Sequence, residues 1–279
     1  MKNPPVLISD RIVRSAIGSK LAYSATTLSE ACNGGRRAEG RCIWPSFGLL
    51  VPVEGDDIDR IGCIADVDGG SKGGPRAVVW RSGRRSKVVA FRGTIGFRDV
   101  ADSLDVRTAR YSSCGSQVRV HSGMLRAFSE MEAALTSRIV GSTPCKDGLP
   151  LSLTFTGHSK GGCHAQFAAA YYGSMLAGSC RVACHTFGAP RAGDGAFADW
   201  YSETVEDSVV MVDRDDPVAR LPPECAGYHG DTALAGTLFV RRKRNPFFSL
   251  ESHDMDSYLE HALGLMISPA SLPGGSGLT

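Results

Sequence analysis

The sequence lacks long hydrophobic runs, an excess of either charge, and the cysteine pairs that hold structural zinc. No stretch of the 279 residues approaches the roughly 18 uncharged apolar residues that a transmembrane helix needs. The 31 basic and 29 acidic residues leave a net charge of +2, which argues against a nucleic-acid binder. None of the nine cysteines forms a C-x-x-C pair, and Cys180 and Cys184 have no second pair or histidine cluster to complete a zinc site. We therefore expect no metal.

The cysteines and the first residues of the chain bear on the cellular compartment of the protein. The nine cysteines are an odd number, and we expect most of them to be buried or free thiols in a reducing compartment. A few disulfides in a secreted protein are the alternative. The first 15 residues contain no long apolar segment, so we expect no secretory signal there and a cytoplasmic location. Secretion, with a signal removed before this numbering, is the alternative.

Short strands alternate with helices after residue 110. Strands are predicted at 117–121, 151–156, 181–187, 208–212 and 238–242, and helices at 124–140, 163–176, 196–201 and 257–265. This alternation is typical of an α/β fold with a mostly parallel sheet and helices on both faces. Earlier candidate strands at 60–67, 76–81 and 87–91 are separated by glycine-rich turns, which predicts antiparallel strands at one edge of the sheet.

The chain shows no internal repeat and no domain linker, so we predict one domain over residues 18–267. Its first helix is predicted at residues 19–31, where apolar residues recur at helical spacing and the sequence N-G-G follows. Residues 1–17 are expected to form a loosely attached arm. Residues 268–279 are rich in serine, proline and glycine and are expected to be a flexible tail.

The sequence G-H-S-K-G-G at residues 157–162 lies between a predicted strand and a predicted helix. In this context G-x-S-x-G forms a nucleophile elbow, a sharp turn that exposes the serine hydroxyl. The glycines let the strand and helix pass closely. The helix start presents free N–H groups and a positive dipole end near a developing oxyanion. Ser159 is therefore the candidate nucleophile.

A serine nucleophile needs a base and a carboxylate that holds the base, and in α/β-hydrolases the acid and then the histidine follow the serine in the chain. The candidates in that order are Asp213, Asp215 and Asp216, then His229, His253 and His261. Asp216 lies on a loop after a predicted strand, and His253 lies in a loop before the last helix, whereas His261 is expected on that helix's surface. From the residues alone, the acidic run could also be a solvated turn, and His253 a polar residue at a helix start.

The chain resembles the class 3 lipase family of the α/β-hydrolase superfamily over residues 18–265. Besides the elbow, motifs occur in the family's order at 89–94 (V-A-F-R-G-T), 121–124 (H-S-G-M), 186–191 (T-F-G-A-P-R), 215–223 (D-D-P-V-A-R-L-P-P), 229–230 (H-G) and 253–259 (H-D-M-D-S-Y-L). The resemblance implies an α/β-hydrolase fold, Asp216 as the acid and His253 as the base. It also implies an oxyanion hole formed by the backbone N–H groups of Thr94 and Lys160, and no cofactor.

By the same resemblance, residues 95–106 occupy the position of a lid over the acyl groove. Its apolar candidates for substrate contact are Ile95, Phe97, Val100 and Leu104. Because the stretch is also charged, we expect weak interfacial activation and a preference for soluble or short-to-medium-chain esters. The implied activity is ester hydrolysis of acyl lipids through an acyl-enzyme. Phospholipase A1 or galactolipase activity, or a non-catalytic interaction module, are the alternatives.

Lys160 departs from the family, which usually has an apolar residue after the nucleophile. Its stem could cover apolar surface while the ammonium reaches solvent, or the ammonium could meet a phosphate or carboxylate of the substrate. The basic run R-R-K-R at 241–244 is either a solvated strand end or a contact for an anionic membrane surface. The expected partners are thus an acyl ester or lipid substrate and a lipid surface, and no nucleic acid.

Overall fold

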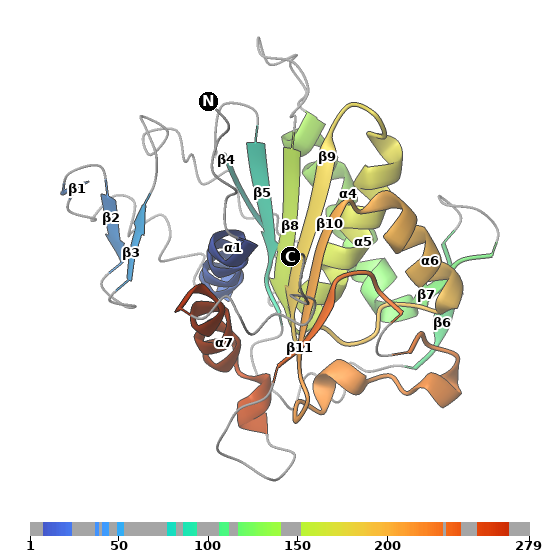
Figure 1. The fold of residues 1–279 in the computed structure, drawn as a ribbon. Coiled ribbons are helices and arrows are strands. Elements are labelled where there is room, and N and C mark those ends of the chain that lie inside the picture. Colours follow the sequence, from blue (N-terminus) through green and yellow to red (C-terminus); the bar gives the residue numbers. More distant parts are fainter. Residues whose placement is uncertain are drawn as a thin grey trace, which may run out of the picture.

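A six-stranded sheet forms the centre of the computed structural model (Figure 1). The structure describes residues 8–23, 37–38, 41–44, 49–52, 77–81, 86–93, 106–111, 117–140, 152–230, 233–240 and 250–267. The sheet order is β11-β10-β9-β8-β5-β4. The strands are β4 (Ala77–Arg81), β5 (Ser86–Phe91), β8 (Ser152–His158), β9 (Arg181–Phe187), β10 (Asp207–Asp213) and β11 (Thr237–Val240).

Five of these strands are parallel, and β4 pairs antiparallel with β5 at one edge. This confirms the predicted mostly parallel sheet with an antiparallel N-terminal strand. Two smaller antiparallel sheets consist of β1 (Arg37–Ala38), β2 (Arg41–Trp44) and β3 (Leu49–Pro52), and of β6 (Thr108–Arg110) and β7 (Arg119–His121). The strand predicted at 60–67 lies outside the described residues.

Helices cover both faces of the central sheet (Figure 1). One face carries α4 (Ser122–Val140), α5 (Lys160–Met175) and α6 (Gly195–Thr204), and the other carries α1 (Ile8–Tyr23) and α7 (Met255–Ile267). Side chains alternate along a strand, so each strand supplies both cores. In β10, Val210 and Val212 join the α4–α6 core, while Val209 and Met211 join the α1–α7 core.

Helix α5, which follows the turn at Ser159, is buried over most of its length. Residues 161–170 are all buried, because their glycines and alanines let α4, α6 and the sheet approach closely. Phe128 of α4 and Phe197 of α6 both pack edge-on against Phe167 of α5. The start of α5, and with it the elbow, is therefore held by packing on several sides.

The prediction of a loose N-terminal arm is wrong from Ile8 onward. The helix predicted at 19–31 instead begins at Ile8 and ends at Tyr23, with Ile12, Val13 and Ala16 buried. Buried hydroxyls tie α1 to the sheet: Ser15 Oγ is 2.7 Å from His185 Nδ1, and Ser19 Oγ is 2.8 Å from Thr156 Oγ1. Apolar residues recur at helical spacing in residues 8–17 as well. Ser15 and Ser19 in this helix form hydrogen bonds with the sheet rather than with solvent. Residues 24–31 and the tail at 268–279 lie outside the described residues.

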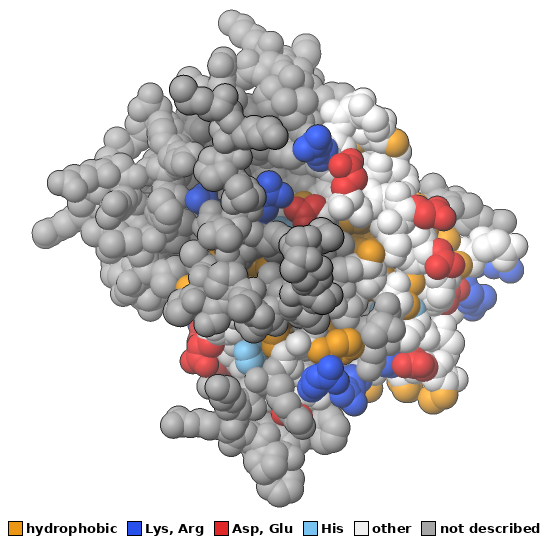
Figure 2. All heavy atoms as spheres, in the orientation of Figure 1, with side chains coloured by type: hydrophobic (Ala, Val, Ile, Leu, Met, Phe, Trp, Pro, Cys, Tyr) orange, Lys and Arg blue, Asp and Glu red, His pale blue; other side chains and the backbone are white. Residues whose placement is uncertain are grey.

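The charges on one face of the molecule agree with the balanced composition. On the face shown in Figure 2, basic and acidic side chains lie interspersed in small groups. Among the helices that the structure describes, none is both long and apolar enough to cross a bilayer.

The packing of α1 predicts the effect of truncating its apolar face. Ile12→Ala is expected to lower the free energy of unfolding by about 2–5 kcal/mol, because it leaves a cavity between α1 and the sheet. Urea denaturation followed by circular dichroism measures this. The control Met175→Ala, at a side chain 42% exposed, should change it by less than about 0.5 kcal/mol. Equal, small effects of both variants would indicate a loose arm.

Candidate active site

Ser159 occupies the sharp turn between β8 and α5. Its φ of 56° lies in the left-handed region, and it is the one non-glycine residue with positive φ in the described part of the chain. Such a conformation costs of order 1–3 kcal/mol and persists only where the surroundings impose it. A Cβ on Gly157 would collide with the Gly161 carbonyl, and a Cβ on Gly161 with the Phe91 carbonyl. The predicted elbow thus has a steric reason for its glycines.

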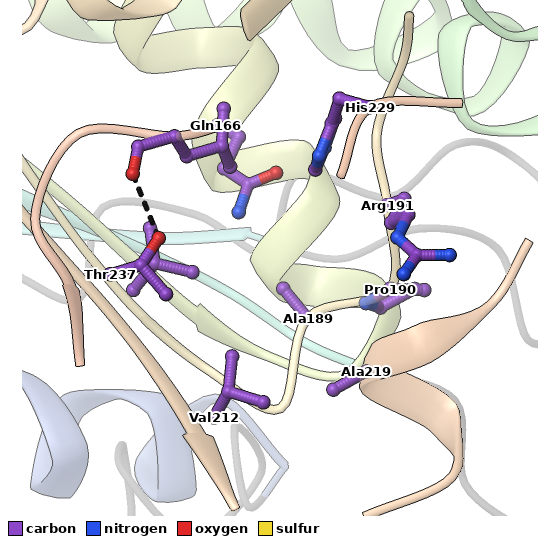
Figure 3. Close-up of a pocket in the computed structure, with 10 residues that line it drawn as sticks. Gln166, Ala189, Pro190, Arg191, Val212, Ala219, His229 and Thr237 are labelled. Atoms are coloured by element: carbon purple, nitrogen blue, oxygen red, sulfur yellow. Dashed lines mark hydrogen bonds between the residues drawn. The ribbon is translucent and has the colours of Figure 1, made fainter. Parts of the chain in front are cut away.

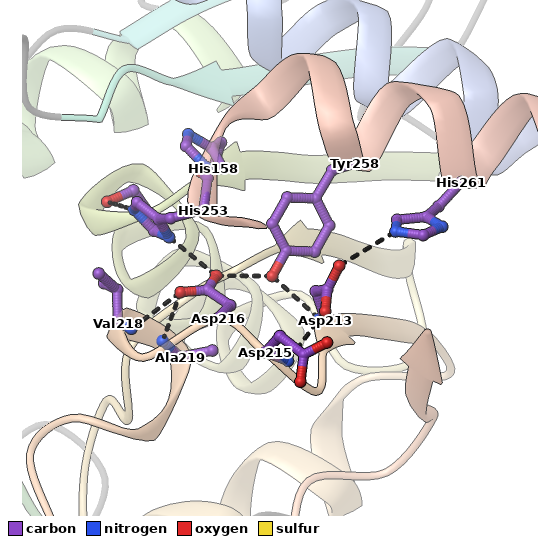
Figure 4. Close-up of polar contacts among 10 residues, drawn as sticks. His158, Asp213, Asp215, Asp216, Val218, Ala219, His253, Tyr258 and His261 are labelled. Carbon is purple, nitrogen blue, oxygen red and sulfur yellow. Dashed lines mark hydrogen bonds and ion pairs between the residues drawn. The ribbon is translucent and has the colours of Figure 1, made fainter. Parts of the chain in front are cut away.

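The structure brings Ser159, Asp216 and His253 together from three separate segments. His253 ends the short 3-10 helix η5 (Leu250–His253), just before α7. Its Nε2 is 2.9 Å from Ser159 Oγ, and its Nδ1 is 2.8 Å from Asp216 Oδ2 (Figure 4). The three residues are only 2%, 0% and 7% exposed, respectively. Because a carboxylate only accepts, Nδ1 carries the proton and Nε2 is left to accept the serine proton.

Both oxygens of the buried Asp216 carboxylate are hydrogen-bonded. Oδ1 accepts the N–H of Val218 at 2.8 Å, and Oδ2 accepts the Tyr258 hydroxyl at 2.6 Å as well as His253. A buried charge needs such donors to offset its desolvation. Burial, followed by the nearby Asp216 charge, raises the pKa of Tyr258 well above its ordinary value, so the phenol stays protonated and donates. The alternative of a solvated acidic turn is therefore wrong.

A second histidine supports the loop that carries His253. The Nε2 of His158 donates to the carbonyl oxygen of His253 at 2.6 Å, and the two ring centroids are 4.7 Å apart. Burial lowers the pKa of His158 well below its ordinary value, and the neighbouring His253 lowers it further. His158 therefore stays neutral, with its proton on Nε2. Sequence reasoning missed this contact because His158 is merely the variable residue of G-x-S-x-G.

The family of the chain follows from these features and from comparison with known proteins. The family model described as "Lipase (class 3)" matches residues 88–225, which include the elbow and Asp216. The chain belongs to the class 3 lipase family. Its six-stranded sheet, elbow and flanking helices form the α/β-hydrolase fold that the sequence predicted.

The relatives of this family member differ in their named activities. The "Secreted mono- and diacylglycerol lipase 1" of Fusarium solani is 30% identical over 196 residues, which cover 68% of this chain and 55% of that protein. "Phospholipase A1 EG1, chloroplastic/mitochondrial" of Oryza sativa subsp. indica is 28% identical over 179 residues, covering 57% of this chain and 40% of that protein. The chain thus spans about half the length of the curated relatives it matches.

A solved relative supports the fold. The crystal structure of a mutant of MDLA from Penicillium cyclopium superposes with a TM-score of 0.58 at 15% identity, covering 88% of this chain and 83% of that chain. At this identity the likeness concerns the fold alone. The cytoplasmic location expected from the sequence finds no support among the relatives, since the Fusarium protein is named as secreted.

The departure of this family member at Lys160 is visible in the structure. Lys160 begins α5, so its N–H is among the first four in the helix, which lack intrahelical acceptors. Its side chain is partly buried, and burial lowers the pKa of the ammonium, while Cys163 and Glu130 act in the opposite direction. The other predicted oxyanion donor, Thr94, and the lid candidates Ile95, Phe97, Val100 and Leu104 lie outside the described residues.

The remaining candidate acids and histidines occupy other positions. His261 was expected on the helix surface, but this is wrong: its side chain is 17% exposed and its Nε2 lies 3.1 Å from the buried Asp213. Asp215 is 7% exposed, and its N–H bonds to Asp213 Oδ1. His229 donates from Nδ1 to the Gly230 carbonyl. Among the described residues, no group of three or more His, Cys, Asp or Glu side chains is arranged for a metal ion.

A small cavity lies beside the loop that carries Asp216, and its lining does not include Ser159, Asp216 or His253 (Figure 3). It has about 20 Å³ of space for the centre of a water molecule. Its lining comprises Gln166, Ala189, Pro190, Arg191, Val210, Val212, Ala219, His229, Leu234 and Thr237. The buried Oε1 of Gln166 has no hydrogen-bond partner in the described part of the chain. The space and polarity suit a single bound water rather than an acyl chain.

Four cysteines in the described part of the chain are free thiols. Cys163, Cys180 and Cys184 are buried and Cys225 is exposed. Burial raises the pKa of Cys180 to about 11 and that of Cys184 to about 12, so these thiols are unreactive near neutral pH. The prediction of buried or free thiols is confirmed for these four of the nine cysteines.

A substitution of Gly188 tests how tightly Asp216 is packed. Its φ is +55°, and a Cβ there would lie 2.7 Å from Asp216 Oδ2 and 2.8 Å from Tyr258 Cε2. Gly188→Ala is expected to lower the free energy of unfolding by more than the roughly 1 kcal/mol typical of a positive φ. Gly178→Ala is the matched control, since Gly178 has φ +75° but nothing within 4 Å. Equal losses in urea denaturation would contradict the close packing around Asp216.

Proposed function

We propose that this chain is a serine hydrolase that cleaves carboxylic esters of acyl lipids. The observation that carries the proposal is the buried His253 ring, bonded to Ser159 through one nitrogen and to Asp216 through the other. This is the arrangement that activates a serine hydroxyl. We also infer that the chain has one catalytic domain. Its start moves from the predicted residue 18 to the beginning of α1, so that the domain runs from α1 to α7.

The proposed reaction passes through an acyl-enzyme. His253 Nε2 takes the proton of Ser159 as Oγ attacks the ester carbonyl, while Asp216 stabilises the imidazolium and its orientation. The tetrahedral intermediate collapses, and His253 gives its proton to the departing alcohol. Water then attacks the acyl-enzyme with His253 again as base, releasing the acid and free Ser159. The protein groups suffice for these steps.

The oxyanion donors are proposed to be the backbone N–H groups of Lys160 and Thr94. The position of Lys160 at the start of α5 supports the first. For the second, the support is indirect: the end of β5 packs tightly against the elbow, since a Cβ on Gly161 would strike Phe91 and Arg92 backbone atoms. Thr94 follows two residues after Arg92 in the chain.

The substrate class is proposed to be acyl lipids, with residues 95–106 as the lid and its apolar side chains as acyl contacts. The named activity of the Fusarium relative supports partial glycerides. Phospholipase A1 activity is the second candidate, because the Oryza relative carries that name.

We propose that the protein is secreted, because the Fusarium relative is named as secreted. Active-site labelling of medium and cell lysate from the source cells would test this location.

Removal of the triad residues tests the function. Ser159→Ala is expected to lower kcat for p-nitrophenyl esters on the order of 10⁶-fold, and Asp216→Asn on the order of 10⁴-fold. Triacylglycerol and phospholipid substrates, assayed beside them, separate the two candidate activities. A fluorophosphonate probe should label the parent at Ser159 and not Ser159→Ala. A folded parent that neither hydrolyses any ester nor takes up the probe would favour a non-catalytic interaction module.

Lys160 offers a test of substrate charge. If its ammonium meets an anionic group of the substrate, Lys160→Leu should lower kcat/KM about 10-fold more for anionic than for neutral esters, because a charge-assisted contact is lost. Lys160→Arg, which keeps the charge, is the control. A uniform change across both ester series would leave the lysine stem as a cover for apolar surface.

A further inference from the structure

A second carboxylate–imidazole pair, Asp213 and His261, lies on the other side of Tyr258 from Asp216 and His253 (Figure 4). Asp213, the last residue of β10, is completely buried, and its Oδ2 lies 3.1 Å from Nε2 of His261 in α7. Its Oδ1 accepts the N–H of Asp215 at 2.9 Å. Both oxygens of Asp213 are therefore engaged, as are both oxygens of Asp216 three residues later.

Tyr258 joins the two pairs. Its hydroxyl accepts the backbone N–H of Asp213 at 3.0 Å and donates to Asp216 Oδ2 at 2.6 Å. Tyr258 and His261 are three residues apart in α7, so they lie on one face of the helix. That face contacts Asp213 twice, at its backbone through Tyr258 and at its side chain through His261.

These contacts bridge the two elements that supply the acid and the base. Asp216 follows β10, and His253 lies two residues before the first residue of α7. A rotation or shift of α7 relative to β10 would move His253 and the Tyr258 hydroxyl away from Asp216 at once. Catalytic groups must be held within about 0.5 Å of their productive geometry, and displacements near 1 Å can cost about 100-fold in rate.

We propose that Asp213 and His261 form a positioning pair that holds α7 in register with β10, and thereby holds Tyr258 and His253 against Asp216. The proposal rests on the function proposed above, because the positions it maintains are those of the Ser159 triad. Neither residue touches Ser159. The pair acts through Tyr258 and through the backbone between residues 253 and 261.

Two substitutions of His261 separate positioning from general stability. His261→Leu removes the N–H donor and keeps much of the side-chain volume, whereas His261→Gln keeps an N–H donor near the place of Nε2. We expect His261→Leu to lower kcat about 10- to 100-fold with KM changed by less than about two-fold. We expect His261→Gln to recover most of that loss.

The control breaks another tie of the same helix. Asp256 of α7 forms an ion pair with Lys20 of α1. Asp256→Asn should lower the Tm of the protein slightly and leave kcat unchanged. The proposal is overturned if His261→Leu lowers Tm without lowering kcat, or if Asp256→Asn lowers kcat as much as His261→Leu.

A spectroscopic measurement keeps the test independent of turnover. The ¹⁵N shifts of the His253 ring, assigned by comparison with His253→Gln, report the hydrogen bond between Nδ1 and Asp216. They should change in His261→Leu, return towards the parent values in His261→Gln, and stay constant in Asp256→Asn. Unchanged shifts in His261→Leu would overturn the proposal. A parent with no hydrolysis and no fluorophosphonate labelling would overturn the proposed function instead, while the shifts would still decide whether the pair positions His253.

Discussion

The left-handed backbone of Ser159 is the constraint on which the rest of the site depends. It turns the chain sharply from β8 into α5 and presents the hydroxyl at the carboxyl edge of the sheet. The turn is possible only because Gly157 and Gly161 let the strand, the helix and the end of β5 pass without Cβ atoms. Its cost is offset by the packing of α5, whose first ten residues after Lys160 are buried. The partners of Ser159 must then reach this fixed point from elsewhere.

Parallel strands bring these partners to Ser159, since their carboxyl ends meet at one edge of the sheet. The loop after β9 brings Gly188 and the loop after β10 brings Asp216, so the space freed by a missing Cβ receives a carboxylate and a phenol. Burial makes each carboxylate depend on hydrogen-bond donors from the protein, because a charge removed from water needs several of them. Asp213 and Asp216 each meet that demand with a backbone N–H and an imidazole. Asp216 also accepts the Tyr258 hydroxyl, which in turn accepts the backbone N–H of Asp213. The same bonds that satisfy the charges also align α7 with β10.

Prediction from the sequence succeeded where the pattern is local. The strands β5, β9 and β10 and the helix α4 have strong periodicity and clear turn residues, and their predicted bounds differ from the observed ones by two residues or fewer. It failed at α1, where Ser15 and Ser19 interrupt the apolar pattern although both are buried and bonded to the sheet. It also assigned His261 to the surface, because nothing nearby in the sequence reveals a carboxylate 48 residues earlier.

The sequence by itself determined the elbow, the order of acid and base after it, and the mostly parallel sheet, since each rests on turn chemistry and short-range spacing. It also singled out Ser159, Asp216 and His253, with help from a family resemblance that ranked them above their neighbours. Only the tertiary structure decided which buried polar groups face one another: His158 with the His253 carbonyl, Tyr258 with Asp216, and His261 with Asp213. These contacts join residues 42–95 positions apart, and their partners are selected by how α7 packs on the sheet, which no local pattern encodes.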